Sequence, residues 1–180
     1  MLREWLVIVV LAMVAAAGGA GVVVQLQKVD AIAREAVREP AIAPDFTVAD
    51  IDDGAPLTLG QLRGKVVLLD LMASWCVACI EGMPALRAIN DSYPADRFTI
   101  FSVGVDDSGD DPGRLRLFRD TYGGSWTFAY DADGVVSFLY EVSVLPTMLL
   151  LDVDGTVLWR GEGLASEALL RSLIDQALAG

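Results

Sequence analysis

The feature that most constrains this fold is a continuous apolar run that leads directly into a segment with two cysteines. Residues 66–71 read VVLLDL, which has the length and composition of a central strand covered on both faces. The segment ASWCVAC follows, and a helical pattern continues to about Asn90, with Pro84 as an expected kink. This order predicts a strand, a turn and a helix. It places Cys76 at or just before the N-terminus of the helix and Cys79 one turn further in, where it faces inward and is shielded.

The rest of the C-terminal part alternates in the same way. The apolar patterns predict further strands at residues 46–48, 57–59, 98–105, 127–130, 147–151 and 156–160, and helices at 114–121, 135–140 and 166–178. Residues 61–64 are expected to form a tight turn, Asp154-Gly155 to close a hairpin, and Ser166 to cap the last helix. We therefore expect an α/β domain with a central mixed sheet and helices on both faces.

The N-terminal part has a different character. Residues 5–24 carry no charge and are long enough to cross a bilayer as a helix, so residues 1–24 are expected to be a transmembrane anchor, with a cleaved signal segment as the alternative. Residues 25–42 read as a helical stalk and linker, and residues 43–180 as the globular domain. The positive charges around the span lean slightly against export of this domain. We still expect it to lie outside the cytoplasm, because long domains are translocated largely regardless of such small imbalances.

Composition excludes several classes of function. The chain has no histidine and only two cysteines, which excludes zinc sites of mixed Cys/His type, four-thiolate sites within one chain and cysteine–histidine nucleophile pairs. Its net charge of −12 repels phosphate backbones, so we expect no nucleic-acid partner.

The position of the two cysteines points to redox chemistry. At a helix N-terminus the unpaired N–H groups and the positive dipole end stabilise an anion, so the Cys76 thiolate should form below the ordinary thiol pKa of about 8.5. Cys76 can then attack a disulfide, and Cys79 can resolve the mixed disulfide. A purely structural bridge remains an alternative, although a bridge across two residues constrains little of the unfolded chain.

Two segments carry a resemblance to a known family. VVLLDLMASWCVAC resembles the active site of the thioredoxin fold, and VLPTMLLLDVDG is similar to the segment in which a cis-proline faces the cysteines. With the preceding APDFTVADIDDGAPLTLGQLRGKVVLLDL and the N-terminal apolar segment, the chain resembles the TlpA-like branch of the redoxins. These are membrane-anchored thiol–disulfide oxidoreductases that include the reductants of cytochrome c maturation.

The resemblance implies roles for particular residues. Cys76 and Cys79 would form the redox-active disulfide, with Cys76 as the nucleophile and Cys79 as the resolving thiol. Trp75 would cover the pair and shape the contact surface. Pro146 would be the cis-proline, and Leu145 would offer backbone groups to an extended substrate segment. No cofactor or metal is implied.

Asp70 falls where thioredoxins bury a carboxylate beneath the resolving cysteine. A carboxyl group that is buried there without a cationic partner should have a raised pKa. It could take the proton of Cys79 during resolution, so Asp70 is the third expected catalytic residue.

The chain also departs from the family. Several reductive members carry a Glu three residues after the second cysteine, whereas this chain has Gly82 there and Glu81 one position earlier, on another face of the helix. The dipeptide Val77-Ala78 contains neither the His of strongly oxidising relatives nor the usual Pro. With no polar side chain between the cysteines to stabilise the thiolate, we expect a reducing potential.

Together these features predict a membrane-tethered enzyme that reduces disulfides of exported proteins and is recharged by a membrane electron donor. An oxidase of exported dithiols is the main alternative, because fold and motif do not fix the direction of electron flow. A peroxidase of the peroxiredoxin type is a minor one. Such enzymes have Thr three residues before the cysteine and Pro four before that, where this chain has Ala73 and Leu69.

Overall fold

Strand β3 (Val66–Met72) lies in the middle of the sheet, and all seven of its residues are buried. It pairs in parallel with β4 (Phe98–Gly104), which pairs in parallel with β5 (Thr127–Tyr130). The computed structural model, which describes residues 41–106 and 109–180, thus confirms the central strand expected at residues 66–71. Because β3 and β4 are parallel, the segments that follow them leave the sheet at the same edge.

Antiparallel strands complete the sheet on both sides. They are β6 (Thr147–Leu151), β7 (Val157–Glu162), β1 (Thr47–Asp50) and β2 (Pro56–Thr58). The strand order is β2-β1-β5-β4-β3-β6-β7, with β6 beside β3 and β1 beside β5. The expected mixed sheet is therefore confirmed.

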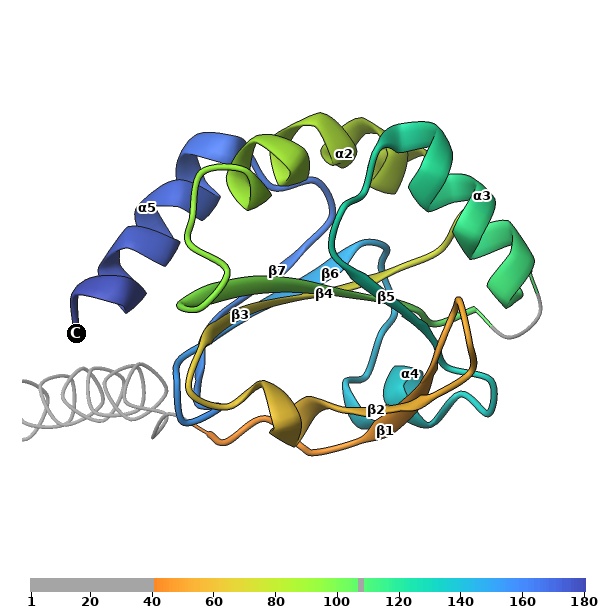
Figure 1. Cartoon of the computed structure of the whole chain (residues 1–180), viewed down its shortest axis with the longest axis horizontal. Coiled ribbons are helices and arrows are strands. Elements are labelled where there is room, and N and C mark those ends of the chain that lie inside the picture. Colours follow the sequence, from red (N-terminus) through yellow and green to blue (C-terminus); the bar gives the residue numbers. More distant parts are fainter. Residues whose placement is uncertain (1–40, 107–108) are drawn as a thin grey trace, which may run out of the picture. The chain divides into compact units, whose positions relative to one another are not determined.

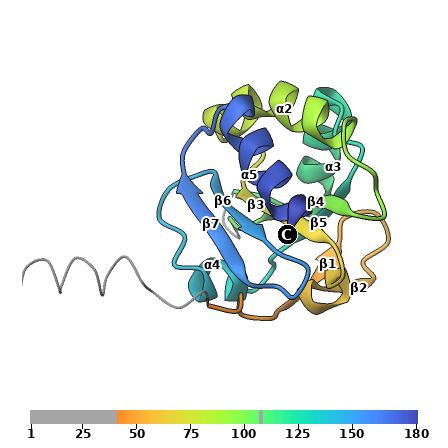
Figure 2. The same ribbon diagram turned by 90° about the vertical axis from the view of Figure 1, so that its left-hand side faces the viewer.

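Helices cover both faces of the sheet, as predicted (Figure 1). The elements concerned are α2 (Val77–Asn90), α3 (Pro112–Tyr122), α5 (Glu167–Ala179), the short α4 (Val135–Leu139) and the 3-10 helix η1 (Leu59–Leu62). In Figure 2, α2, α3 and α5 lie on one side of the sheet and α4 on the other. Side chains alternate along β3, so Leu68 and Met72 join the core beneath the three long helices, whereas Leu69 and Leu71 join the core on the face of α4.

Local signals account for the ends of several elements. The Ser166 hydroxyl accepts a hydrogen bond from the Leu169 N–H at 3.3 Å, so Ser166 is the expected N-cap of α5. Gly155, at a φ of 84°, lies in the turn between β6 and β7, which confirms the hairpin. The turn expected at residues 61–64 is partly wrong. Its first half belongs to η1. Thr58 is the N-cap of this 3-10 helix, and its backbone N–H donates a hydrogen bond of 3.2 Å to Oε1 of Gln61, which stabilises the first turn.

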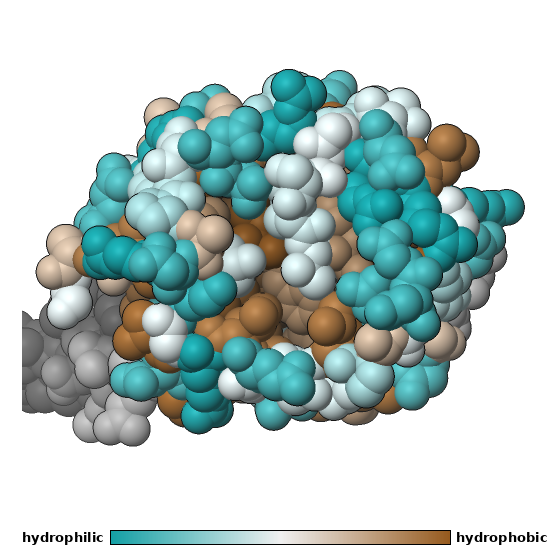
Figure 3. All heavy atoms as spheres, in the orientation of Figure 1, coloured by the Kyte–Doolittle hydropathy of each residue, from teal (hydrophilic) through white to brown (hydrophobic). Residues whose placement is uncertain are grey.

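The distribution of hydropathy follows these layers. In Figure 3, polar and charged side chains cover the outer surface of the helices, and apolar side chains show between the helical layer and the layer of β1 and β2. Apart from the buried Asp70, Asp110 and Asp131, the acidic side chains of the described part therefore lie at the surface that surrounds two apolar cores.

Within residues 41–106 and 109–180, no helix combines the length and the apolar character that a membrane span requires. The transmembrane or signal segment expected at residues 1–24 and the stalk expected over most of residues 25–42 lie outside the described residues.

Candidate active site

Cys76 is the N-cap residue of α2, as the sequence predicted. Its Sγ atom accepts a hydrogen bond of 3.1 Å from the backbone N–H of Cys79, and its carbonyl accepts the N–H of Ile80 at 3.1 Å. The two cysteines are joined by a disulfide bond, with their Cα atoms 5.2 Å apart. The sulfur of Cys76 thus lies at the positive end of a 14-residue helix, where a thiolate is stabilised once the bond is reduced.

The expected difference in shielding between the two cysteines is not found. Cys76 and Cys79 are each only 5% exposed, and both belong to the apolar core beneath α2. The two cysteines differ in hydrogen bonding, because Sγ of Cys76 accepts the bond from the Cys79 N–H. The neighbouring side chains of Trp75 and Val77 are 57% and 68% exposed, so the buried disulfide lies beside an apolar surface.

Trp75 is held by the loop that follows β4. Its indole N–H donates a hydrogen bond of 2.7 Å to Oδ2 of Asp106. A Cβ atom added at Gly109 would lie 2.6 Å from the indole nitrogen, so the loop passes closely over the ring. The ring therefore has a defined orientation beside the cysteines, as its predicted role in the contact surface requires.

Asp110, from the same loop, holds the residue before the tryptophan. Its carboxylate accepts a hydrogen bond of 2.8 Å from the Ser74 N–H and another from the Ser74 hydroxyl. Asp106, Asp110 and Ser74 were not predicted from the sequence. The acidic cluster that directly follows β4 could have indicated them. Because β3 and β4 are parallel, their carboxyl ends lie at one edge of the sheet, so this cluster lies beside the segment that carries the cysteines.

Asp70 is a buried carboxyl group on the sheet face that α2 covers. It is 3% exposed, and its Oδ2 atom accepts a hydrogen bond of 2.8 Å from the hydroxyl of Ser102 on β4. Burial raises the pKa of Asp70 from 3.8 to about 6, and the hydrogen bond from Ser102 opposes this rise. The raised pKa predicted from the sequence is thus confirmed, whereas Ser102 was not anticipated.

The Leu145–Pro146 peptide bond is cis, as the resemblance implied. Thr147 pairs with Leu71 across β6 and β3, so Pro146 lies next to the end of β3 and close to the turn that carries the cysteines. Leu145 packs against the core that contains both cysteines. The structure therefore brings Leu145 and Pro146, two of the three predicted substrate-binding residues, to the same end of the sheet as Cys76.

The departures in α2 have clear structural consequences. Gly82 is buried, and a Cβ atom there would lie 3.4 Å from Cδ1 of Leu164, in the loop before α5. A methyl group would therefore fit at position 82 in van der Waals contact with this loop, whereas a longer side chain would meet it. Glu81 is exposed, on another face of the helix than the buried Gly82.

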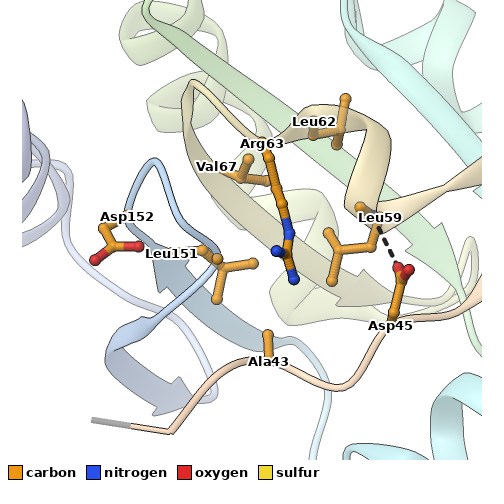
Figure 4. Close-up of a pocket in the computed structure, with 10 residues that line it drawn as sticks. Ala43, Asp45, Leu59, Leu62, Arg63, Val67, Leu151 and Asp152 are labelled. Carbon is orange, nitrogen blue, oxygen red and sulfur yellow. Dashed lines mark hydrogen bonds between the residues drawn. The ribbon is translucent and has the colours of Figure 1, made fainter.

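A separate small pocket lies on the opposite face of the sheet, toward the beginning of β3 (Figure 4). In this view the side chain of Arg63 extends between Leu151 and Leu59, and the Asp45 carboxylate accepts the Gly60 N–H at 2.8 Å. None of the predicted site residues lines this pocket. The contacts around this pocket attach the segment before β1 to η1. We therefore interpret the pocket as structural and place the candidate site at the cysteines.

Comparisons with known proteins agree with this geometry. The Redoxin family model matches residues 37–178. The chain is 29% identical over 157 residues to the thioredoxin-like protein YneN of Bacillus subtilis, covering 87% of this chain and 88% of YneN. It is 27% identical over 142 residues to the thiol-disulfide oxidoreductase ResA of the same species, covering 79% of this chain and 77% of ResA.

A solved structure is similar over the same region. The putative thiol:disulfide interchange protein DsbE from Chlorobium tepidum superposes with a TM-score of 0.70 and 30% identity, covering 77% of this chain and 96% of that one. Because the family model spans most of the chain and the matching fold places two bonded cysteines at a helix N-terminus, this chain belongs to the Redoxin family, in its TlpA-like branch of thiol–disulfide oxidoreductases.

Proposed function

We propose that this enzyme reduces disulfides of other proteins outside the cytoplasm, through exchange at Cys76 and Cys79. The observation that carries the proposal is the position of the Cys76 sulfur, which caps α2 and accepts the Cys79 N–H at 3.1 Å. This environment favours the thiolate, which is the form that attacks disulfides. A disulfide with only a structural role has no use for such an environment.

The exchange proceeds in two steps. The Cys76 thiolate attacks one sulfur of the substrate disulfide, the substrate S–S bond breaks, and the other substrate sulfur leaves as a thiolate. Cys79 then loses its proton to Asp70 and attacks Sγ of Cys76, which breaks the mixed disulfide and releases the second substrate sulfur. The substrate gains two electrons, and the protein is left with the Cys76–Cys79 disulfide seen in the structure.

The substrate would meet the apolar surface beside the disulfide. Trp75 and Val77 are exposed there, and Val144, which precedes the cis-proline segment, is also exposed. An extended stretch of the substrate could then pair with backbone groups of Leu145, with Pro146 beneath it. This arrangement suits proteins with exposed disulfides better than a small molecule, because the surface is open and apolar.

The reducing direction is supported by what surrounds the thiolate. Between the cysteines only Val77 and Ala78 occur, and the hydrogen bond given above for Sγ of Cys76 comes from the backbone. The Cys76 thiolate is thus less stabilised than in relatives that have a polar side chain between the cysteines. This makes the dithiol a better electron donor than theirs. The TlpA-like branch includes reductants of cytochrome c maturation, so exported apocytochromes are candidate substrates, and a membrane protein that donates electrons would regenerate the dithiol.

The test is disulfide reduction of insulin by the full chain, with dithiothreitol as the electron source. Cys76→Ser should abolish the acceleration over dithiothreitol alone, because the attacking sulfur is lost. Cys79→Ser should accumulate mixed disulfides, because no thiol is left to resolve them. Full activity of Cys76→Ser would refute the proposal, as would a Cys79→Ser protein that traps no substrate.

A further inference from the structure

A chain of hydrogen bonds ends at the buried carboxyl group of Asp70. The indole N–H of Trp126 lies 2.9 Å from Oγ of Ser102, and this Oγ lies 2.8 Å from Oδ2 of Asp70. An indole nitrogen can only donate, so Ser102 accepts from Trp126. The single hydroxyl hydrogen of Ser102 is then available for Asp70, which fixes the direction of both bonds.

The fold fixes the position of this chain as well. Asp70 on β3 and Ser102 on β4 are directly paired in the parallel register, and both are buried on the face beneath α2. The ring of Trp126 stacks on Phe128, with ring centroids 5.5 Å apart and an interplanar angle of 24°. The indole is therefore held in place by packing and not by the hydrogen bond alone.

The two oxygens of the Asp70 carboxyl group are not equivalent. Oδ2 accepts the hydroxyl of Ser102, whereas Oδ1 is fully buried and has no hydrogen-bond partner among the described residues. A buried oxygen without a partner is costly as part of a charged carboxylate, and a proton on it removes that penalty. Oδ1 is thus the oxygen on which a proton would reside.

We propose that Ser102 and Trp126 form a positioning pair for Asp70, in which the indole directs the serine hydroxyl to Oδ2 so that Oδ1 alone exchanges the proton of Cys79. This inference rests on the proposed function, because it concerns the step in which Cys79 resolves the mixed disulfide. Ser102 and Trp126 touch no reacting atom. They act through the orientation and the basicity of Asp70.

Among the described residues, the hydrogen bond from Ser102 is the stabilising contact of the Asp70 charge, and the tyrosines that border the same core are Tyr93, Tyr122 and Tyr130. On the same face, β6 contributes Met148, which pairs with Asp70, while α3 and α5 contribute apolar side chains such as Leu115 and Leu170. The titratable groups that α2 brings to this core are the two cysteines. Burial raises the pKa of Asp70, and only the Ser102 hydrogen bond acts against it. Loss of that bond should therefore raise this pKa further.

The test follows one turnover of the reduced full chain with dithiobis(nitrobenzoate), whose coloured thiolate is released twice. The first release reports the attack by Cys76, and the second reports resolution by Cys79. Ser102→Ala should move the pH midpoint of the second release upward by about one unit, since a hydrogen bond to a charged group is lost. The midpoint of the first release should stay in place.

Two further variants separate positioning from a general structural effect. Trp126→Phe keeps an aromatic ring against Phe128 but removes the N–H that donates to Ser102. It should move the pH midpoint of the second release upward by a smaller amount. This variant also tests the inference if Ser102→Ala fails to fold. In an Asp70→Asn background, Ser102→Ala should leave the pH profile unchanged, because the group through which Ser102 acts is absent.

Each outcome has a defined meaning. An unmoved second midpoint in folded Ser102→Ala or Trp126→Phe would overturn the inference and leave the proposed function intact. The same would follow if Ser102→Ala moved the midpoint in the Asp70→Asn background. Absence of the first release in the unsubstituted protein would overturn the proposed function, and the inference with it.

Discussion

The carboxylate of Asp110 accepts hydrogen bonds from both the backbone N–H and the hydroxyl of Ser74, two residues before Cys76. Asp110 is only 7% exposed, although it lies in the loop after β4. The loop that carries the cysteines is therefore fastened to a neighbouring loop by a buried acid as well as by its own helix.

Replacing Asp110 with Ala should destabilise the oxidised protein by about 1–3 kcal/mol, because the partly buried Ser74 N–H would be left without its partner. Urea unfolding followed by circular dichroism measures this change. Asp96→Ala is the matched control, since Asp96 is exposed and should change the free energy of unfolding by less than about 0.5 kcal/mol. Equal effects of the two substitutions would show that Asp110 does not fasten the loop.

Asp70 should make the stability of the protein depend on pH. Below the ordinary value of 3.8 the carboxyl group is protonated in both the folded and the unfolded chain, and above about 6 it is charged in both. Because burial raises the pKa in the folded state, the folded protein loses stability as the pH rises through this window. The total loss should be on the order of 3 kcal/mol.

Asp70→Asn removes this titration and should unfold at a higher urea concentration than the unsubstituted protein at pH 7.5. The advantage should shrink steadily as the pH is lowered toward 4.5, because the native carboxyl group then becomes protonated. Unfolding curves at several pH values, compared between the two proteins, isolate Asp70 from the other acids. A difference that stays constant with pH would contradict the raised pKa.

Two glycines should respond to alanine in opposite directions. Gly82 lies inside α2 with room for a methyl group at 3.4 Å from Leu164, so Gly82→Ala should stabilise the protein by about 0.5–1 kcal/mol. A Cβ atom at Gly104 would lie 2.5 Å from Cδ1 of the buried Leu115, so Gly104→Ala should destabilise it by about 1–3 kcal/mol. Thermal unfolding checks both, and a loss of stability in Gly82→Ala would mean that the contact with Leu164 leaves no room.

Much of this fold follows from local patterns. The apolar run around Asp70 predicts a buried strand because no surface strand is apolar at successive positions, and it also predicts that Asp70 itself is buried. The position of Cys76 as a helix N-cap follows from the same strand and turn. The 3-10 helix at residues 59–62 was missed although Thr58 and Gln61 have the spacing of a capping box.

The remaining features of the site depend on contacts between residues that are far apart in the sequence, which local patterns do not predict. Ser102 meets Asp70 only because β3 and β4 pair in one particular parallel register, and a shift by one residue would turn Ser102 to the other face. Trp126 reaches Ser102 from the bend just before β5, the strand on the other side of β4. The equal burial of Cys76 and Cys79 was likewise not predicted from their positions along the helix.

The proposed location can be tested with a reporter enzyme that is active only outside the cytoplasm, fused after Gly180. We expect activity of this fusion in intact cells, because residues 5–24 have the composition of a span and the TlpA-like branch is exported. A reporter active only in the cytoplasm, fused at the same position, is the control and should be silent. The reverse pattern would contradict export.

The central claim is that Cys76 and Cys79 form a reducing couple, and their redox equilibrium tests it most directly. The full chain is equilibrated with defined ratios of dithiothreitol or glutathione, and the reduced fraction is counted by thiol alkylation. We predict a potential near about −270 mV, in the range of thioredoxin. A potential near about −120 mV, which is that of a strong oxidant of dithiols, would contradict the proposed direction of electron flow.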